Sequence, residues 1–126
     1  MASISVALLL GLGLIASCGK PLPSGTFRGA RKETGRPGAD PIVLAQLNRV
    51  ILKIGANGRA DLEDGGIPWE GQVTRSGDQI DFTVAALNGI NIERQASDLP
   101  RRLTFRVISE DVLDFGGVRL ERSAER

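Results

Sequence analysis

From residue 48 to residue 122 the chain alternates apolar and polar side chains along short segments. Val50, Leu52 and Ile54 begin this pattern, with Ile51 and Lys53 between them. The later apolar positions are Ala60 and Leu62; Trp69, Gly71 and Val73; Ile80, Phe82 and Val84; Ile90 and Ile92; Leu103, Phe105 and Val107; Leu113 and Phe115; Val118 and Leu120. Because every second side chain of a strand points to the same face, the pattern predicts strands with one buried face.

Turn-forming residues separate these segments. They are Asn57-Gly58, Gly65-Gly66, Ser76-Gly77-Asp78, Asn88-Gly89, Ser109-Glu110-Asp111 and Gly116-Gly117. Short strands joined by tight turns predict an all-β domain over residues 25–122, a small antiparallel meander that forms either a barrel or a sandwich. Asp40-Pro41 is typical of a helix start, so residues 41–47 form either a short helix or another strand. Residues 123–126 are a tail.

The N-terminal region has a different composition. Ile4 to Ile15 is almost entirely apolar, but it is shorter than the roughly 20 residues that a membrane-spanning helix needs. Its length suits the apolar core of a secretory signal peptide, and the small residues Ala16 and Ser17 follow it. The next residue, Cys18, is the only cysteine in the chain.

Ile15-Ala16-Ser17-Cys18 resembles the lipobox of bacterial lipoprotein signal peptides. The resemblance implies that residues 1–17 are removed, that Cys18 carries the lipid, and that residues 18–24 (CGKPLPS) form a flexible lipidated tether. Two or more acyl chains hold a protein stably on a membrane. Gly19, where members retained at the inner membrane tend to have Asp, favours the outer membrane of a cell that has one. The alternatives for Cys18 are a buried structural residue and a catalytic thiol, but the latter usually needs a histidine and the chain has none.

Composition excludes several function classes. The formal net charge is +1, whereas a nucleic-acid-binding domain would show a strongly basic face. Lys20, Arg28, Arg31, Lys32 and Arg36 are concentrated near Cys18, where they either attract anionic headgroups or belong to a solvated tether. Without histidine the chain lacks the usual general base and the usual zinc ligand, so we expect neither a cofactor nor a metal.

Two groups of carboxylates are the remaining candidates for chemistry. Asp61, Glu63 and Asp64 precede Gly65-Gly66, but their spacing does not match an EF-hand loop, and acidic residues are common in turns. Asp81 and Asp114 occupy equivalent places in the similar segments SGDQIDF and SEDVLDF. On neighbouring strands they would make a carboxylate pair, whereas the alternation places both on the solvated face.

The layout as a whole resembles small bacterial lipoproteins with a lipocalin-like meander. The residues that carry this resemblance are Gly25-Thr26-Phe27, Leu52–Gly58, Trp69–Gly71, Gly77-Asp78 and Val118–Arg122. It implies a fold and no particular activity. We therefore expect a lipid-anchored protein of the bacterial cell envelope that is not an enzyme, a structural or interaction module that contacts another envelope component through its outer face or loops.

The alternative is a lipocalin-like carrier of a small apolar ligand. Its cavity would be lined by Trp69, Ile80, Phe82, Phe105 and Phe115, with Trp69 as a wall against which a ligand stacks. In the first interpretation the same side chains are packed core. How fully they fill the interior distinguishes the two.

Overall fold

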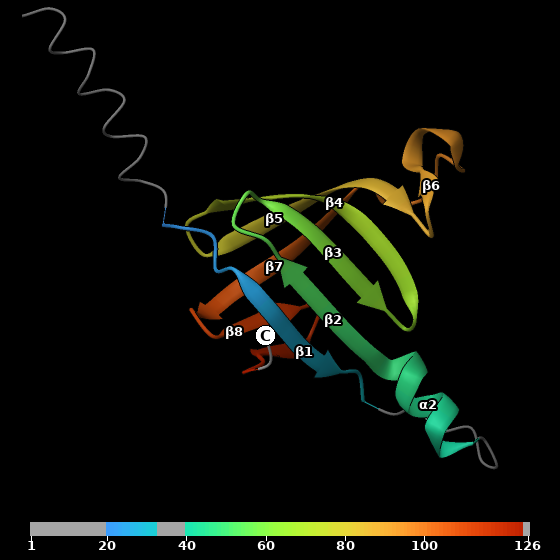
Figure 1. Cartoon of the computed structure of the whole chain (residues 1–126), viewed down its shortest axis with the longest axis horizontal. Helices are drawn as coiled ribbons and strands as arrows, with labels where there is room; N and C mark the ends of the chain where they lie inside the picture. The colour runs from blue at the N-terminus through green and yellow to red at the C-terminus, as the bar shows by residue number, and fades with distance from the viewer. Residues whose placement is uncertain (1–19, 33–39, 125–126) are drawn as a thin grey trace, which may run out of the picture.

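The chain folds into a single closed β-barrel (Figure 1). The structure is a computed structural model that describes residues 20–32 and 40–124. Each barrel strand pairs antiparallel with the next one along the chain, and β9 returns to pair with β1 through Phe27–Arg122 and Arg28–Glu121. The predicted antiparallel meander is confirmed, and of the two architectures it allowed, the structure is the barrel.

Eight of the nine strands in the described residues form the ring, and the two-residue β6 lies beside β5 outside it. The ring strands are β1 (Gly25–Ala30), β2 (Arg49–Ile54), β3 (Arg59–Asp64), β4 (Ile67–Ser76), β5 (Gln79–Leu87), β7 (Arg102–Ser109), β8 (Val112–Phe115) and β9 (Val118–Arg122). The other elements are the helix α2 (Pro41–Asn48), the strand β6 (Ile90–Asn91) and the 3-10 helix η1 (Ile92–Arg94).

The predicted turns lie where the strands reverse direction. At Asn88-Gly89 both residues have positive φ, 55° and 80°. This backbone is strained for most L-residues, but asparagine and glycine tolerate it, which explains why this dipeptide favours a tight hairpin. The chain then departs from the prediction: Ile92 opens η1 and does not continue a strand, because the Asn91 side chain caps the backbone N–H of Glu93 at 2.8 Å.

The barrel interior is the hydrophobic core. The largest side chains that are fully buried there are Phe27, Phe82, Phe105, Leu52, Leu62, Ile80, Leu113, Leu120 and Val50. All except Phe27, which precedes the alternating segments, are at positions where the alternation predicts an inward side chain, and all belong to one contiguous cluster. Ile51 is the exception: the alternation turns it outward on β2, yet it is only 8% exposed.

Two irregularities in strand pairing interrupt the alternation. Glu70 pairs with Ala86 but Gly71 pairs with Val84, so β5 contains one extra residue, Ala85. Likewise β7 has Ile108 as an extra residue opposite β8. Such bulges bend a strand and increase its twist, which helps a sheet close on itself. Without the bulge in β5, Leu87 would point outward.

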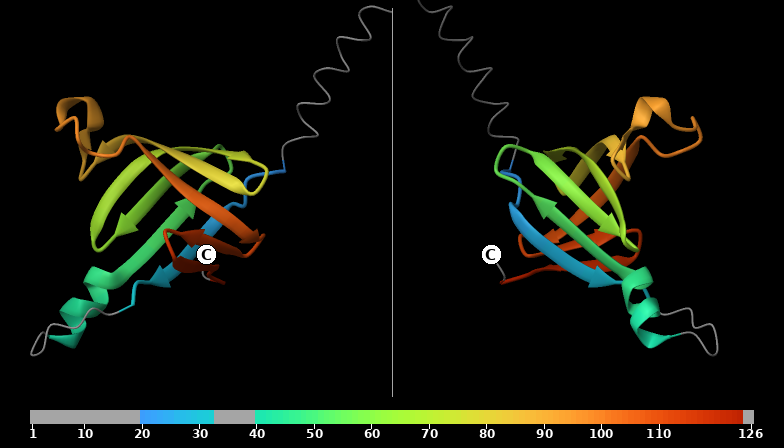
Figure 2. Two further views of the ribbon diagram at one scale, coloured as in Figure 1. Left: turned by 180° about the vertical axis from the view of Figure 1, so that it is seen from behind. Right: turned by 45° about the vertical axis from the view of Figure 1, so that its right-hand side comes forward.

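The helix α2 begins as the sequence predicts. Asp40 accepts a hydrogen bond from the Ile42 N–H at 2.8 Å, and Pro41 is the first helical residue. The helix projects beyond the barrel wall at the start of β2, and none of its residues is buried (Figure 2). Among residues 20–32 and 40–124, no helix has the length and apolarity needed to cross a bilayer.

Candidate functional site

The two ends of the barrel differ in chemistry. At one end β1 begins, β9 ends, and residues 20–24 lie close to the turns at 55–58, 77–78 and 110–111; we call it the tether end. At the opposite end are α2, the turns at 65–66 and 116–117, and the excursion at 88–101; we call it the helix end. Cys18 and residues 1–17 lie outside the described residues, and Lys20 at the tether end is the first residue described.

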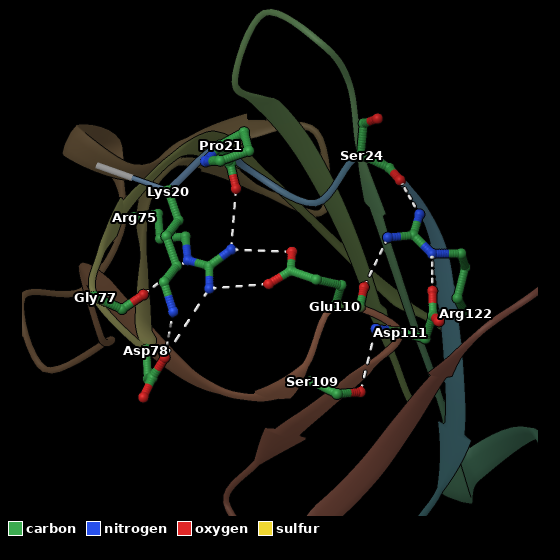
Figure 3. A network of polar contacts seen from close by, with 10 residues as sticks. All are labelled: Lys20, Pro21, Ser24, Arg75, Gly77, Asp78, Ser109, Glu110, Asp111 and Arg122. Atoms are coloured by element: carbon green, nitrogen blue, oxygen red, sulfur yellow. Dashed lines mark hydrogen bonds and ion pairs between the residues drawn. The ribbon is translucent and has the colours of Figure 1, made fainter. Parts of the chain in front are cut away.

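Arg75 is the centre of a polar network at the tether end (Figure 3). It is on β4, and its side chain is only 1% exposed. Its Nε donates to the carbonyl of Gly77 at 2.7 Å, and its two terminal nitrogens donate to the carboxylate of Glu110 at 3.2 and 3.3 Å. Nη1 also donates to the carbonyl of Pro21 at 3.0 Å. The guanidinium therefore joins the β4–β5 turn, the β7–β8 turn and the N-terminal segment.

Arg122, at the end of β9, makes a second set of bonds to the same segment (Figure 3). Its Nε donates to Asp111 at 2.7 Å and its Nη2 to the Glu110 carbonyl at 2.7 Å, while Nη1 donates to the carbonyl of Ser24. The guanidinium lies 4.8 Å from the centre of the Phe27 ring, so it also covers the core at this end.

Apolar contacts reinforce these bonds. Leu22 packs against the core cluster, Pro23 is buried, and Gly58 of the β2–β3 turn lies against Leu22. Composition predicts a flexible linker over residues 18–24, but residues 20–24 are held against the barrel. The reason is that Arg75 and Arg122 satisfy the backbone carbonyls of a segment whose prolines cannot donate. We call residues 20–24 together with Arg75, Glu110 and Arg122 the clamp.

Charge in the clamp is balanced locally. The hydrogen bond from Arg75 lowers the pKa of Glu110, and the charges of Arg75, Lys20 and Arg122 lower it further. Lys20 also lies 4.0 Å from Asp78. Glu110 is thus a carboxylate at neutral pH, and it neutralises a guanidinium that is removed from water.

The helix end is closed by a different arginine. Arg31 follows β1 and forms a bidentate hydrogen-bonded ion pair with Asp64 at the end of β3. Its guanidinium lies 5.9 Å from the centre of the Phe115 ring. The bond to Asp64 raises the pKa of Arg31. Each end of the barrel therefore has an arginine beside a phenylalanine ring, Arg122 by the buried Phe27 and Arg31 by the partly buried Phe115.

Exposed large apolar side chains are concentrated at the helix end. Ile42 is 73% exposed and Leu47 is 56% exposed, and neither is covered by the described part of the barrel. The other exposed ones at this end are Val43, Ile67 and Ile90, and Ile108 is the one near the tether end. We call Ile42, Val43, Leu47, Ile67 and Ile90 the apolar rim.

The predicted cavity residues are divided between the core and its edge. Ile80, Phe82 and Phe105 are fully buried. Trp69 and Phe115 are partly buried and pack against the core near the helix end. Phe105 on β7 stacks on Phe115 of the neighbouring strand β8 with ring centres 4.5 Å apart, so these two side chains pack against each other.

A hollow of about 350 Å³ lies on the outer wall of the barrel. Its lining includes Ile51, Lys53, Asp61, Glu63 and Pro68, which belong to β2, β3 and β4. Leu62 and Gly66 also contribute to the lining, and none of these residues is among the five that line the carrier cavity predicted from sequence.

The two groups of candidate carboxylates do not come together in the described residues, although Asp61 and Glu63 both line the hollow on the outer wall. Asp61 and Glu63 face outward, while Asp64 is bound to Arg31. The strand β7 lies between the strands of Asp81 and Asp114, where Asp81 pairs with Thr104 and Asp114 with Arg106. Within residues 20–32 and 40–124, no cluster of three or more acidic or thiol ligands could hold a metal ion.

The sequence prediction missed Arg31, Arg75 and Arg122. The sequence does contain a signal for them, because each arginine lies two residues beyond the last inward-facing residue of its strand and so shares its inward direction. Arg75 follows Gly71 and Val73, and Arg122 follows Val118 and Leu120. A charged residue in the inward phase at a strand end points to the barrel mouth, where it can cover the core and bond to a neighbouring turn.

Comparison with known proteins yields no relative. No family model matches the chain, no curated protein is significantly similar to it, and no solved structure matches its fold at a significant level.

Proposed function

We propose that the protein is a lipid-anchored module of the bacterial cell envelope, attached to the membrane through Cys18. It acts without catalysis, as a structural or interaction module for another envelope component. The attachment is supported by the lipobox-like residues Ile15–Cys18 and by the short distance along the chain from Cys18 to the clamp. In a cell with two membranes, Gly19 favours the outer one.

One observation carries the interaction role: the apolar rim lies at the end of the barrel opposite the tether end. Exposed apolar side chains concentrated at one end of a domain support a role of that end in binding a partner. The helix α2 contributes Ile42, Val43 and Leu47, and it holds them clear of the barrel wall (Figure 1). The contiguous core formed by Ile80, Phe82 and Phe105 also supports action through the surface over transport of a ligand.

The anchor is tested by the Cys18→Ser variant in a cell that processes lipoproteins. The variant is expected to lose incorporation of labelled fatty acid and to move from the membrane to the soluble envelope fraction. Ser17→Ala is the matched control, because the lipobox pattern accepts alanine at that position. Labelling of the Cys18→Ser protein, or its continued tight association with the membrane, would refute the anchor.

The interaction role is tested by a photoreactive residue at Val43, which is 49% exposed on α2. We expect crosslinks to an envelope protein from Val43 and none to the same protein from Thr74, an exposed residue on the outer wall of β4. Equal crosslinking from the two positions would remove the reason for assigning the role to the apolar rim.

A further inference from the structure

We propose that the barrel stands on the membrane on its tether end, with the turns at 55–58, 77–78 and 110–111 against zwitterionic lipid headgroups, and that the clamp fixes this orientation. The inference rests on the proposed attachment at Cys18 and adds which surface meets the bilayer. Three observations carry it: the length of chain before the clamp, the strength of the clamp, and the chemistry of the two barrel ends.

The number of residues between Cys18 and the clamp limits the distance between the barrel and the membrane surface. An extended chain spans at most about 3.6 Å per residue, so the Cα atoms of Cys18 and Pro21 are at most about 11 Å apart. The carbonyl of Pro21 is bound by Arg75 on β4. A linker that was free up to Gly25 would reach about 25 Å by the same rule. The clamp thus halves the reach and leaves the domain little freedom to tumble above the membrane.

The clamp is stable because its central cation, the guanidinium of Arg75, is buried. Arg75 has lost its water and receives acceptors from Pro21, Gly77 and Glu110 in return. Releasing residues 20–24 would remove the Pro21 acceptor and would also expose the core surface that Leu22 covers. Both changes are unfavourable, the first because a buried charge needs its partners and the second because apolar surface returns to water.

The tether end suits the headgroup layer of a membrane. Its exposed charges have both signs: the side chains of Lys20, Asp78 and Asp111 are 62%, 71% and 74% exposed. Glu110 adds a carboxylate that is 60% exposed. Each of these carboxylates has a basic partner, Asp78 with Lys20, Glu110 with Arg75 and Asp111 with Arg122. This end therefore carries charges of both signs and little net charge, which suits zwitterionic headgroups. The apolar rim, in contrast, points away from the bilayer in this orientation and stays free for a partner.

The protein contains one natural probe for this orientation. Trp69 is its only tryptophan, and it is near the helix end, where it pairs with Leu62. The strand β3 begins at Arg59, three positions before Leu62 and about 10 Å from it along the strand, and Ala56 lies beyond Arg59 in the β2–β3 turn. A protein with Trp69→Phe and Ala56→Trp therefore places the same fluorophore at the tether end.

The chain from Cys18 onward, which keeps every strand of the barrel, is coupled through its single thiol to a maleimide-headgroup lipid in phosphatidylcholine vesicles. Energy transfer from tryptophan to a dansyl-headgroup lipid is then measured. We expect transfer in the Trp69→Phe, Ala56→Trp protein to be about twofold higher than in the parent, because Ala56 lies more than about 10 Å further along the hairpin toward the tether end than Leu62, the partner of Trp69. Equal transfer from the two positions, or greater transfer from Trp69, would overturn the proposed orientation.

The role of the clamp is tested in the same vesicles with Leu22→Ser combined with Glu110→Gln, both on the Trp69 protein. Transfer from Trp69 is expected to rise because the released barrel can tilt toward the bilayer, whereas Arg106→Gln on the outer face of β7 leaves it unchanged. Urea unfolding of each protein verifies that the barrel is folded. A folded double variant with unchanged transfer would refute the role of the clamp.

Chemical coupling makes these results independent of whether a cell lipidates Cys18. The fractionation of Cys18→Ser tests the proposed function alone, and the vesicle experiment tests the orientation alone.

Discussion

Replacing Phe105 with alanine should test whether the interior is a packed core. The ring is 0% exposed, it stacks on Phe115 at 4.5 Å, and it lies 6.4 Å from the ring of Phe82. Removing a buried phenylalanine ring costs about 3–5 kcal/mol, since the transfer free energy is lost and a cavity remains. A small domain has a free energy of unfolding of about 5–15 kcal/mol, so the variant should lose roughly a fifth or more of its stability.

Urea unfolding of the chain from residue 18, carrying Cys18→Ser in every variant, measures this loss. With an m-value of about 2 kcal/mol/M, a cost of about 4 kcal/mol lowers the midpoint by about 2 M. Phe115→Ala should cost about half as much, because that ring is only partly buried. The double variant should then reveal a coupling of about 0.5–1.5 kcal/mol from the stacked rings.

The matched control is Ile108→Thr, which changes an exposed β-branched residue on the same strand. It should change the free energy of unfolding by about 0.5 kcal/mol or less. If Phe105→Ala costs less than about 1 kcal/mol, the interior tolerates an empty space as large as a phenyl ring. That result would refute the packed core and would revive the carrier alternative.

Two further perturbations test the barrel and its clamp. Gly71→Ala should destabilise the protein by more than the roughly 1–3 kcal/mol that is typical of overpacking, because the new Cβ would lie 2.1 Å from the carbonyl oxygen of Thr83. Thermal unfolding measures the loss. The control is Gly55→Ala, where the atom nearest to the new Cβ is the Asn57 side-chain oxygen at 3.3 Å. Glu110→Gln should lower the melting temperature at neutral pH. Because the folded pKa of Glu110 is depressed, the carboxylate stabilises the fold fully above the ordinary pKa of 4.5, and this stabilisation is lost as the pH falls through the lower folded value. The melting temperatures of the two proteins should therefore converge below about pH 4.5, and a constant difference down to acid pH would contradict the ion pair.

Local signals in the sequence predict most of the strands but not their closure. Alternation and turn dipeptides such as Asn57-Gly58 locate the hairpins, because both depend on residues adjacent in the chain. A barrel and a sandwich need the same alternation, so it cannot distinguish them. The difference lies in the pairing of β1 with β9, which joins residues nearly a hundred positions apart, and in the bulges at Ala85 and Ile108, which shift the phase by one residue.

The clamp was missed for a related reason. Arg75 contacts Pro21 and Glu110, which are 54 and 35 residues away in the sequence. Composition treats residues 18–24 as a linker because proline, glycine and serine are common in linkers. Those residue types also suit a segment that lies on a barrel mouth, provided that something else supplies hydrogen-bond donors to its carbonyls. Arginines at inward positions of β4 and β9 supply them.

An inward-phase arginine lies over a phenylalanine at each mouth of the barrel, Arg122 over Phe27 and Arg31 over Phe115. In the function that we propose, the interior contributes stability and the two ends meet other molecules. The tether end is occupied by the protein's own N-terminal segment and presents charges of both signs. The helix end carries the apolar rim on α2 and the neighbouring turns. In the orientation that we propose, the polar end faces the membrane and the apolar end is directed outward, so that an envelope module of this kind would contact a partner while remaining at the membrane.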